Sequence, residues 1–559
     1  MAEGSRSFPD DTYPRGWIRL LIPSVGDLIF VVLLALLTLT PLSVRLLGDA
    51  GIGWHIRAGQ EILATHAIPR GDAFSSSMGG KPWFRWEWLY DLAVGGLERV
   101  AGLNGVVLVT ALVIAAVFGW TFRLLVGRGT DIFLAVVLVM LAASASMIHF
   151  FARPHVVSWL LTLAWFQVLD SSQRAALGAA RPISGRIRTG PWLWFLPLLM
   201  LLWVNLHGGF LVAFVLLGIY WLSTMWRGFT PASNRLEDIL EKRRAGKRAR
   251  DLAWVTGLAA MATLVNPYGF RLHAHIYRYL SNRFLMDHID EFQSPNFHGV
   301  AQKCFALLLL ITLLAATAKT RKLTMSDGLV VLFAVYSGLY ASRNIPVASL
   351  LLVLVVGPPL SAAMKRSVER SGTSWRLRRV GTGLAVFSGR MGEIESSLRG
   401  HLWAVVAFVI IFGVVANGGK IRSTEVMNAH FDSQRFPAAA VRFLEQSGVR
   451  EPVLGPDYWG GYLIYRLYPQ TLVAVDDRHD LYGEEFLKSY LKLVNVEPGW
   501  EDLLTNYNIH RVLLPTGSAP SNILAETAEW KMIYEDQVGV IFVRSSAFIQ
   551  IEPGINGWQ

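Results

Sequence analysis

The sequence contains one cysteine, Cys304, among its 559 residues, and charged residues make up only 17% of the chain. A single cysteine excludes a disulfide framework within the chain and zinc sites built from paired cysteines. The charged fraction is below the roughly 25% that is usual in soluble domains. Hydrophobic residues make up 53% of the chain, and the mean hydropathy is +0.39. This composition excludes a disordered chain and predicts a polytopic membrane protein.

Acidic residues are scarce before position 417 and abundant after it. Residues 1–416 carry a formal charge of +17, whereas residues 417–559 carry −6. In a soluble protein the isoelectric point of 9.7 would suggest a nucleic-acid partner. Here the basic residues cluster in loops between apolar runs, which is typical of the cytoplasmic loops of membrane proteins. We therefore expect no nucleic-acid binding.

Eleven apolar runs predict a mostly α fold, a transmembrane bundle of about eleven helices. The runs lie at 28–44, 102–122, 132–151, 156–169, 192–204, 210–226, 252–265, 304–318, 328–340, 345–364 and 402–415. The first follows a polar segment with three arginines and precedes no small-residue cleavage site, which indicates an uncleaved signal anchor. Trp192–Trp226 is too long for one span and is interrupted at 205–209, so we expect a two-helix hairpin there.

Charge predicts how these spans are oriented in a plasma (inner) membrane. If all eleven cross and the N-terminus is cytoplasmic, the cytoplasmic segments hold 28 Lys and Arg in 123 residues, against 10 in 101 outside. This asymmetry agrees with the positive-inside rule. We therefore expect a cytoplasmic segment 1–24, a membrane domain 25–416 with a first outer loop 48–101, and an extracytoplasmic domain 417–559.

The terminal segment 417–559 predicts a small α/β domain, because helix-like and β-rich stretches alternate along it. The helix-like stretches are 438–446, 462–467, 484–494 and 500–506. The β-rich stretches are 452–454, 471–475, 511–514, 530–534 and 538–543, of which the last two predict a hairpin. Two polar loops follow predicted strands, 457–462 and 475–480, and they either belong to a ligand site or serve only as turns. The domain is expected to bind an acceptor glycan or to cover the membrane site.

Most unusual polar residues of the membrane part fall on the outer side in this topology. They are Asp49, His55, Asp72, Arg85, Glu87, Arg153, His155, Asn205, His207, Asn266, Asp290, Glu291, Arg343 and Asn344. Each has a structural explanation when it is taken alone: a solvated acid, an interfacial arginine, a hydrogen-bonding histidine or a helix end. Ionisable groups near a membrane are costly without partners or a wet cavity, so their coincidence on one face predicts a site.

The amino-acid sequences of several segments resemble those of a known family. The segments are Gly48–His55, Gly59–Leu63, Ile68–Ser75, Lys81–Trp83 with Glu87–Leu89, Trp203–Phe210 and Arg343–Pro346. They resemble bacterial GT-C-type membrane glycosyltransferases, a superfamily that includes protein mannosyltransferases and lipid A aminoarabinose transferases. The resemblance implies transfer of a sugar from a polyprenyl-phosphate carrier at the outer leaflet, with an acid of the first outer loop serving the acceptor. Asp49 is the matching position, and Gly51 stands where many relatives carry a second acid.

The chemistry of such a transfer needs one base for the acceptor hydroxyl and positive charge beside the phosphate. We expect Asp49 to be the base, with Glu87 or Asp72 as the alternative. The candidate phosphate and substrate contacts are Arg153, Arg343, His207, His55, His155, Asn205 and Asn344. One base without a nucleophile-plus-acid pair predicts inversion at the anomeric carbon. No metal site is predicted, and a divalent cation stays an open possibility.

The expected partners are a polyprenyl-phosphate sugar donor, a glycan, lipid or protein acceptor, and membrane lipids. The sequence contains no phosphate-binding glycine loop with Lys-Ser/Thr and no His-Glu-x-x-His, which argues against ATP hydrolysis and zinc-protease chemistry. Two alternatives stay open. A polar cavity among broken helices also suits a transporter or flippase for a lipid-linked or anionic solute. The third possibility is a non-catalytic membrane scaffold whose outer domain binds a partner.

Overall fold

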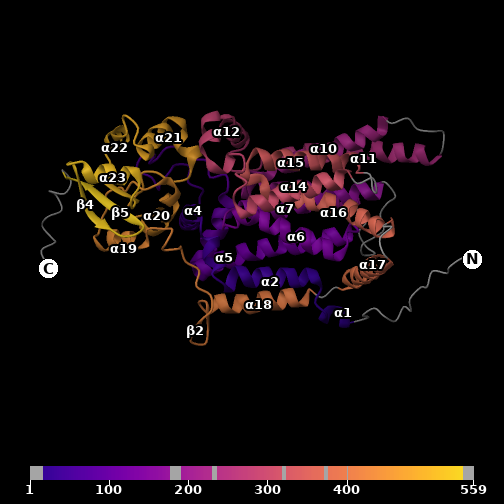
Figure 1. Cartoon of the computed structure of the whole chain (residues 1–559). Coiled ribbons are helices and arrows are strands. Elements are labelled where there is room, and N and C mark those ends of the chain that lie inside the picture. The colour runs from indigo at the N-terminus through magenta and orange to yellow at the C-terminus, as the bar shows by residue number, and fades with distance from the viewer. Residues whose placement is uncertain are drawn as a thin grey trace, which may run out of the picture.

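The computed structural model describes residues 17–176, 190–229, 236–317, 323–370, 375–398 and 401–545. Figure 1 shows a bundle of roughly parallel helices with a smaller α/β part at one end. The bundle contains α1 (Ile18–Leu21), α2 (Val25–Leu39), α3 (Leu42–Leu46), α4 (Gly51–Thr65), α5 (Trp88–Gly127), α6 (Ile132–Ser146), α7 (His155–Ala176), α8 (Gly190–Leu193), α9 (Leu196–Leu206), α10 (Leu211–Phe229), α11 (Leu236–Ala262), α12 (Phe270–Ser281), α13 (Arg283–His288), α14 (Val300–Thr317), α15 (Met325–Tyr340), α16 (Ile345–Arg370), α17 (Trp375–Ser397) and α18 (Leu402–Ala416).

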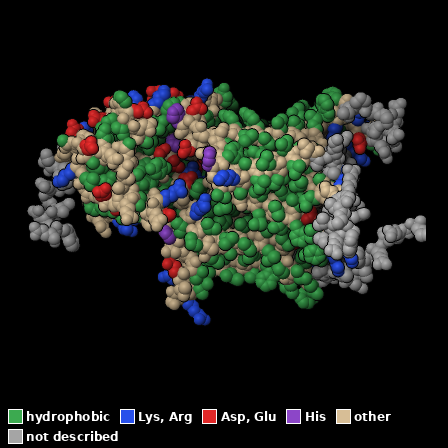
Figure 2. Space-filling view, viewed as in Figure 1, with side chains coloured by type: hydrophobic (Ala, Val, Ile, Leu, Met, Phe, Trp, Pro, Cys, Tyr) green, Lys and Arg blue, Asp and Glu red, His purple; other side chains and the backbone are tan. Residues whose placement is uncertain are grey.

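All eleven predicted apolar runs lie largely in helices, but the count of eleven spans is not confirmed. Six helices among the described residues are long and apolar enough to cross a membrane, or seven if one bent pair is a single span. Several other helices are short. For example, α9 has 11 residues and extends about 16 Å, roughly half of a bilayer core of about 30 Å. The hydrophobic surface along the bundle in Figure 2 agrees with a membrane protein.

Two local interruptions bring polar residues to the same end of the bundle. The predicted hairpin is confirmed: α9 ends at Leu206, a 3-10 turn covers Gly208–Phe210, and α10 follows. In the first outer loop, α4 begins at Gly51, two residues after Asp49, and α5 begins at Trp88, well before its apolar run. Gly102 interrupts α5 with a φ of 59°, a conformation that glycine adopts readily.

The C-terminal part follows the predicted α/β pattern. Its helices are α19 (Ala438–Gln446), α20 (Asp457–Leu467), α21 (His479–Asn495), α22 (Glu501–Asn506) and α23 (Ala519–Glu526). Its strands are β1 (Lys420–Ile421), β2 (Thr424–Glu425), β3 (Arg511–Pro515), β4 (Trp530–Glu535) and β5 (Gly539–Arg544). The order β3-β5-β4 is antiparallel, which confirms the terminal hairpin. The expected strands 452–454 and 471–475 form only isolated parallel bridges.

The first outer loop is joined directly to the C-terminal part. Ser75 pairs with Val473 in a parallel bridge, which continues the line of bridges through Val453 and Leu454. Next to this contact, α20 packs against α4 where both helices have glycine. A Cβ atom at Gly53 would lie 2.1 Å from the carbonyl oxygen of Gly461, so only glycine permits this approach. The loop that precedes α21 is thereby fixed over the polar end of the bundle.

Candidate functional site

A cavity of about 460 Å³ lies where the polar end of the bundle meets the C-terminal part. Figure 2 shows charged and histidine side chains gathered at this junction. Seven of the ten predicted site residues line the cavity: Asp49, Glu87, Arg153, His155, His207, Arg343 and Asn344. They come from the first outer loop and from the ends of α7, α9 and α16. The structure therefore brings together most of the polar residues that the topology placed on one face.

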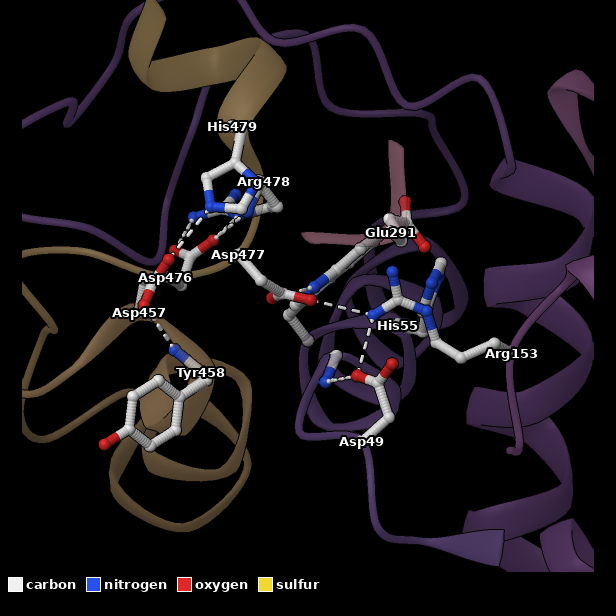
Figure 3. Close-up of polar contacts among 12 residues, drawn as sticks. Asp49, His55, Arg153, Glu291, Asp457, Tyr458, Asp476, Asp477, Arg478 and His479 are labelled. Carbon is white, nitrogen blue, oxygen red and sulfur yellow. Dashed lines mark hydrogen bonds and ion pairs between the residues drawn. The ribbon is translucent and has the colours of Figure 1, made fainter. Parts of the chain in front are cut away.

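Asp49 and Arg153 form an ion pair in this cavity, and Asp477 of the C-terminal part completes it (Figure 3). Nη1 of Arg153 lies 3.1 Å from Oδ1 of Asp49 and 2.8 Å from Oδ2 of Asp477. The backbone N–H of Gly51, at the start of α4, donates to the same Oδ1 of Asp49 at 2.9 Å. Burial disfavours the charge on Arg153, but the two carboxylates overcome this effect and raise its pKa above the usual value. We call these three residues the cavity triad.

Glu87 lies between two histidines on the neighbouring wall. Its Oε1 is 3.6 Å from Nε2 of His207, and its Oε2 is 3.7 Å from Nε2 of His55. The N–H of Gly209 donates to Nδ1 of His207, which places the histidine proton on Nε2, toward Glu87. Burial raises the pKa of Glu87 to about 8 and lowers the pKa of His207 to about 3. At neutral pH this wall therefore presents a protonated carboxyl group beside neutral imidazoles.

Arg343 supplies a second cation to the cavity lining. Its Nη1 lies 3.2 Å from Oε1 of Glu291, and its guanidinium carbon lies 4.4 Å from the ring centre of Phe292. Partial burial would raise the pKa of Glu291, but Arg343 lowers it below the usual value, so this pair is ionised at neutral pH. Asn344 is oriented by its Nδ2, which donates to the carbonyl of Ser337 at 3.1 Å.

Nearby, His155 occupies the end of α7. Its Nε2 lies 2.8 Å from the carbonyl oxygen of His149, to which it donates. Both rings line the cavity. Because Nε2 carries the proton, Nδ1 of His155 is left as a hydrogen-bond acceptor.

Three predicted residues do not line the cavity. Asp72 is wholly buried, and its Oδ1 accepts a hydrogen bond from Nη1 of Arg478 at 2.6 Å, so it has no access to a substrate. Asn205 accepts a hydrogen bond from Nε1 of Trp88 and donates to the carbonyl of Val265, which joins three segments of the bundle. His55 is also fully buried, one layer behind Glu87. The structure thus gives these three residues supporting positions.

The hydrogen-bond partner of His55 is Asp91, which the sequence did not suggest. Nδ1 of His55 lies 2.5 Å from Oδ1 of Asp91, and the His55 ring stacks on Trp54. Burial lowers the pKa of His55 well below its usual value. This contact holds His55 in the orientation that faces Glu87.

The sequence left open whether the outer domain covers the membrane part, and the structure brings its loop 475–480 to the cavity. Asp477, Arg478, His479 and Asp480 all line the cavity, although they lie more than 130 residues after α16 begins. The loop was recognisable as a polar segment after a predicted strand. Its meeting with Asp49 depends on the glycine contact between α4 and α20, which no local pattern reports.

No family model matches the sequence, and no curated protein matches it. Solved structures do match. Archaeal oligosaccharyltransferase AglB from Archaeoglobus fulgidus, in complex with an inhibitory peptide and a dolichol-phosphate, is 10% identical at a TM-score of 0.53, covering 88% of this chain and 69% of its own. The apo form of the Archaeoglobus fulgidus oligosaccharyltransferase is 12% identical at a TM-score of 0.50, covering 90% and 70%.

A third similar structure is apo ArnT from Cupriavidus metallidurans. It is 13% identical at a TM-score of 0.47 and covers 94% of this chain and 97% of its own. The assignment of the fold rests on the two archaeal structures. Both are oligosaccharyltransferases of the GT-C superfamily, and the chain has a GT-C-like fold.

Proposed function

We propose that this protein is a membrane glycosyltransferase that moves a sugar from a polyprenyl-phosphate carrier to an acceptor at the outer leaflet. One observation carries the proposal. In a GT-C-like fold, a first-loop carboxylate, Asp49, shares a cavity with the partly exposed guanidinium groups of Arg153 and Arg343. This combination provides a proton acceptor and phosphate-binding cations within one small space.

The proposed reaction uses side-chain atoms of the site that form no hydrogen bond to the described residues. Among the described residues, the hydrogen bonds of Asp49 all use Oδ1, and its side chain is one-third exposed, so Oδ2 can receive the acceptor's proton. The acceptor oxygen attacks the anomeric carbon as the bond to the phosphate oxygen breaks. The electron pair of that bond leaves with the polyprenyl phosphate. Attack from the face opposite the phosphate inverts the anomeric centre.

The leaving phosphate gains negative charge, and arginine suits it because the planar guanidinium pairs with two oxygens at once. Both hydrogen bonds of Arg153 to the described residues use Nη1, which leaves Nη2 and Nε for phosphate oxygens. Arg343 also lines the cavity and provides a second guanidinium group. Glu87, which is protonated at neutral pH, serves as a hydrogen-bond donor to the sugar. Asp49 is therefore the base in this proposal.

Apolar residues line another part of the cavity and suit the lipid portion of the donor. Leu211, Leu280 and Tyr340 are each at least 40% exposed, and Met286 and Val347 lie beside them. The archaeal structure with this fold was determined with a dolichol-phosphate, which is a polyprenyl-type carrier. We propose a carrier of the same chemical class here.

The orientation of the chain in the membrane is also part of the proposal. A cytoplasmic N-terminus, an extracytoplasmic segment 417–559 and a location in the inner membrane place the cavity at the outer boundary of the bilayer. Labelling of single cysteines introduced at exposed positions in Cys304→Ser background tests this. Cysteine at Thr505 in α22 should react from outside, and cysteine at Lys247 in α11 only after permeabilisation. Both residues are exposed. Labelling of the two from the same side would contradict the proposed arrangement.

Transfer itself is tested with the purified full-length protein in proteoliposomes that contain polyprenyl-phosphate sugars and candidate acceptors. The wild type should form a new glycosidic bond, and Asp49→Asn should lower kcat by about 10²–10⁴-fold, as expected for loss of a general base. Asp502→Asn is the matched control, because Asp502 is an exposed acid in α22. Unaltered transfer by Asp49→Asn would exclude Asp49 as the base. Movement of the carrier without a new bond would favour a flippase.

A further inference from the structure

Gly51 has no room for a side chain, although it stands where related first loops carry a second acid. A Cβ atom at this position would lie 1.4 Å from Nη1 of Arg153 and 2.5 Å from Oδ2 of Asp477. Both distances are far below van der Waals contact. Gly51 is in an ordinary helical conformation, so the constraint is the neighbouring guanidinium and not the backbone. The place of the second acid is thus occupied by an arginine.

A second carboxylate, that of Asp477, is present nonetheless, and it belongs to the C-terminal part. Asp477 reaches the same position through its Oδ2, which pairs with Arg153 at 2.8 Å. Its other oxygen, Oδ1, accepts a hydrogen bond from Nε1 of Trp54 at 2.9 Å, three residues after Gly51 in α4. Figure 3 shows the carboxylates of Asp49 and Asp477 on two sides of the same nitrogen. The cation between them is covalently part of the chain.

We propose that Arg153 is the resident cation of this site and that Asp477 is its second carboxylate, so that the donor phosphate is bound by a guanidinium without a divalent metal ion. This inference rests on the proposed function for the identity of the ligand. Asp477 acts as a positioning residue, since it holds Nη1 of Arg153 while Nη2 and Nε stay directed to the phosphate.

A divalent metal does not fit the residues of the triad. Mg²⁺ and Ca²⁺ take about six to eight oxygen ligands at roughly 2.0–2.6 Å, and the space between the two carboxylates is already filled by a positively charged nitrogen. Within the described part of the chain, no group of three or more His, Cys, Asp and Glu side chains is arranged to hold a metal. The cation that a metal would supply is therefore supplied by Arg153.

Metal binding by the purified full-length protein tests this inference without an activity assay. Titration with Mn²⁺, followed by electron paramagnetic resonance, should show no saturable site at the triad in the wild type. Arg153→Asp replaces the cation by a third carboxylate and should create one Mn²⁺ site, which Asp49→Asn then removes. A stoichiometric wild-type site that Asp49→Asn abolishes would overturn the inference, as would an Arg153→Asp variant that is folded and binds no Mn²⁺.

The steric part is tested by a pair of glycine variants. Gly51→Ala must displace Arg153, so it should raise the donor KM at least tenfold, while Gly257→Ala in α11, where a Cβ meets no atom within 4 Å, should leave it unchanged. Equal donor KM values for the wild type and Gly51→Ala would contradict the packing on which the inference rests.

The positioning role of Asp477 predicts that its substitution changes the donor KM more than kcat. Asp477→Asn should raise the donor KM about tenfold with kcat within about twofold, because uniform binding of the phosphate is weakened. Asp477→Glu should recover part of the loss, and EDTA should leave wild-type transfer unchanged. A loss of transfer in EDTA that Mn²⁺ restores would overturn the inference. If no donor is ever transferred, the proposed function fails, while the Mn²⁺ titrations still decide whether Arg153 excludes a metal.

Discussion

Two clusters with the same composition, one arginine between two aspartates, lie side by side in this molecule. The cavity triad has Arg153 between Asp49 and Asp477, with side chains 21%, 33% and 18% exposed. The second cluster has Arg478 between Asp72 and Asp476, all at most 1% exposed. We call it the buried triad. Asp476 and Asp477 are consecutive, yet each belongs to a different triad.

The difference between the triads lies in how fully their hydrogen bonds are used. In the buried triad, Asp72 accepts from Ser75 and from the backbone of Phe74, Asp476 accepts from Tyr482, and Arg478 donates through three nitrogens. In the cavity triad, Arg153 donates to the described residues through one nitrogen only. A saturated cluster holds segments together, whereas an unsaturated one at a cavity has capacity for a ligand.

The pKa values separate the triads in the same way. Burial would raise the pKa of Asp72, but Arg478 and the hydrogen bonds lower it overall. Burial raises the pKa of Asp477, and Arg153 only partly opposes this effect. In the buried triad Asp72 is therefore kept ionised, whereas in the cavity triad burial disfavours the charge on Asp477.

The largest predicted effect comes from removing each arginine in turn. Arg478→Ala leaves two buried carboxylates unpaired and should cost about 3–5 kcal/mol of unfolding free energy. Arg153→Ala, at the partly exposed triad, should cost about 1 kcal/mol while abolishing donor binding. Thermal unfolding in detergent and a donor-binding assay measure both. Similar losses of stability in the two variants would remove the distinction between the triads.

A second prediction concerns pH and Glu87, on the cavity side of the comparison. Because its pKa is raised to about 8, the folded protein keeps a proton on Glu87 that the unfolded chain releases near pH 4.5. Stability should therefore fall as pH rises from 4.5 to 8, by up to about 1.4 kcal/mol per pH unit, and level off above 8. Asp72 has the opposite sign: its lowered pKa adds stability above pH 3.8 that is lost in acid.

Unfolding midpoints of wild type and Glu87→Gln between pH 5 and 9 isolate this contribution. The difference between the two should shrink steadily as pH falls from 8. A difference that is independent of pH would show that Glu87 ionises normally in the folded protein.

The third prediction compares two asparagines that the sequence placed in one site. Asn205→Ala leaves Nε1 of Trp88 without its acceptor and should cost about 1–3 kcal/mol of stability, with transfer per folded molecule unchanged. Asn344 lines the cavity, so Asn344→Ala should instead change the donor KM. Unfolding curves and steady-state kinetics on the same preparations separate the two effects. A kinetic defect confined to Asn205→Ala would reverse the assignment.

The smallest expected effect belongs to the pair of Arg343 and Glu291. Their side chains are 30% and 44% exposed, so a double-mutant cycle with Arg343→Ala and Glu291→Ala should give a coupling of only about 0.2–1 kcal/mol in stability. The cycle is measured by thermal unfolding. A coupling energy as large as the loss of stability expected for Arg478→Ala would mean that the pair of Arg343 and Glu291 also has a structural role.

The sequence predicted the class of fold well because its signals are local. Apolar runs, the break at 205–209 and the β-rich segments each depend on a few neighbouring residues, and the structure confirms the hairpin and the terminal strand pair. The count of eleven spans is not confirmed, because an apolar run such as that of α9 reports hydrophobicity and not the length of the final helix.

The candidate site was predicted in part, for a related reason. Topology alone brought Asp49, Arg153, His207 and Arg343 to one end, and they share a cavity. Composition could not distinguish Asp72 from Asp49, since both are acids of the same loop that pair with an arginine, Asp72 with Arg478 and Asp49 with Arg153. Only the tertiary contacts show which carboxylate has its hydrogen bonds fully satisfied. Such contacts leave no periodic pattern in a single sequence.

The contact of α4 with α20 through bare glycine backbone has one further consequence. A Cβ at Gly461 would lie 2.2 Å from the carbonyl oxygen of Ala50, and one at Gly53 is equally obstructed, so the two helices are locked in register. Helices that touch at this distance do not slide or hinge past each other. The C-terminal part is accordingly held against α4 at this contact, where its loop 477–480 forms part of the cavity lining.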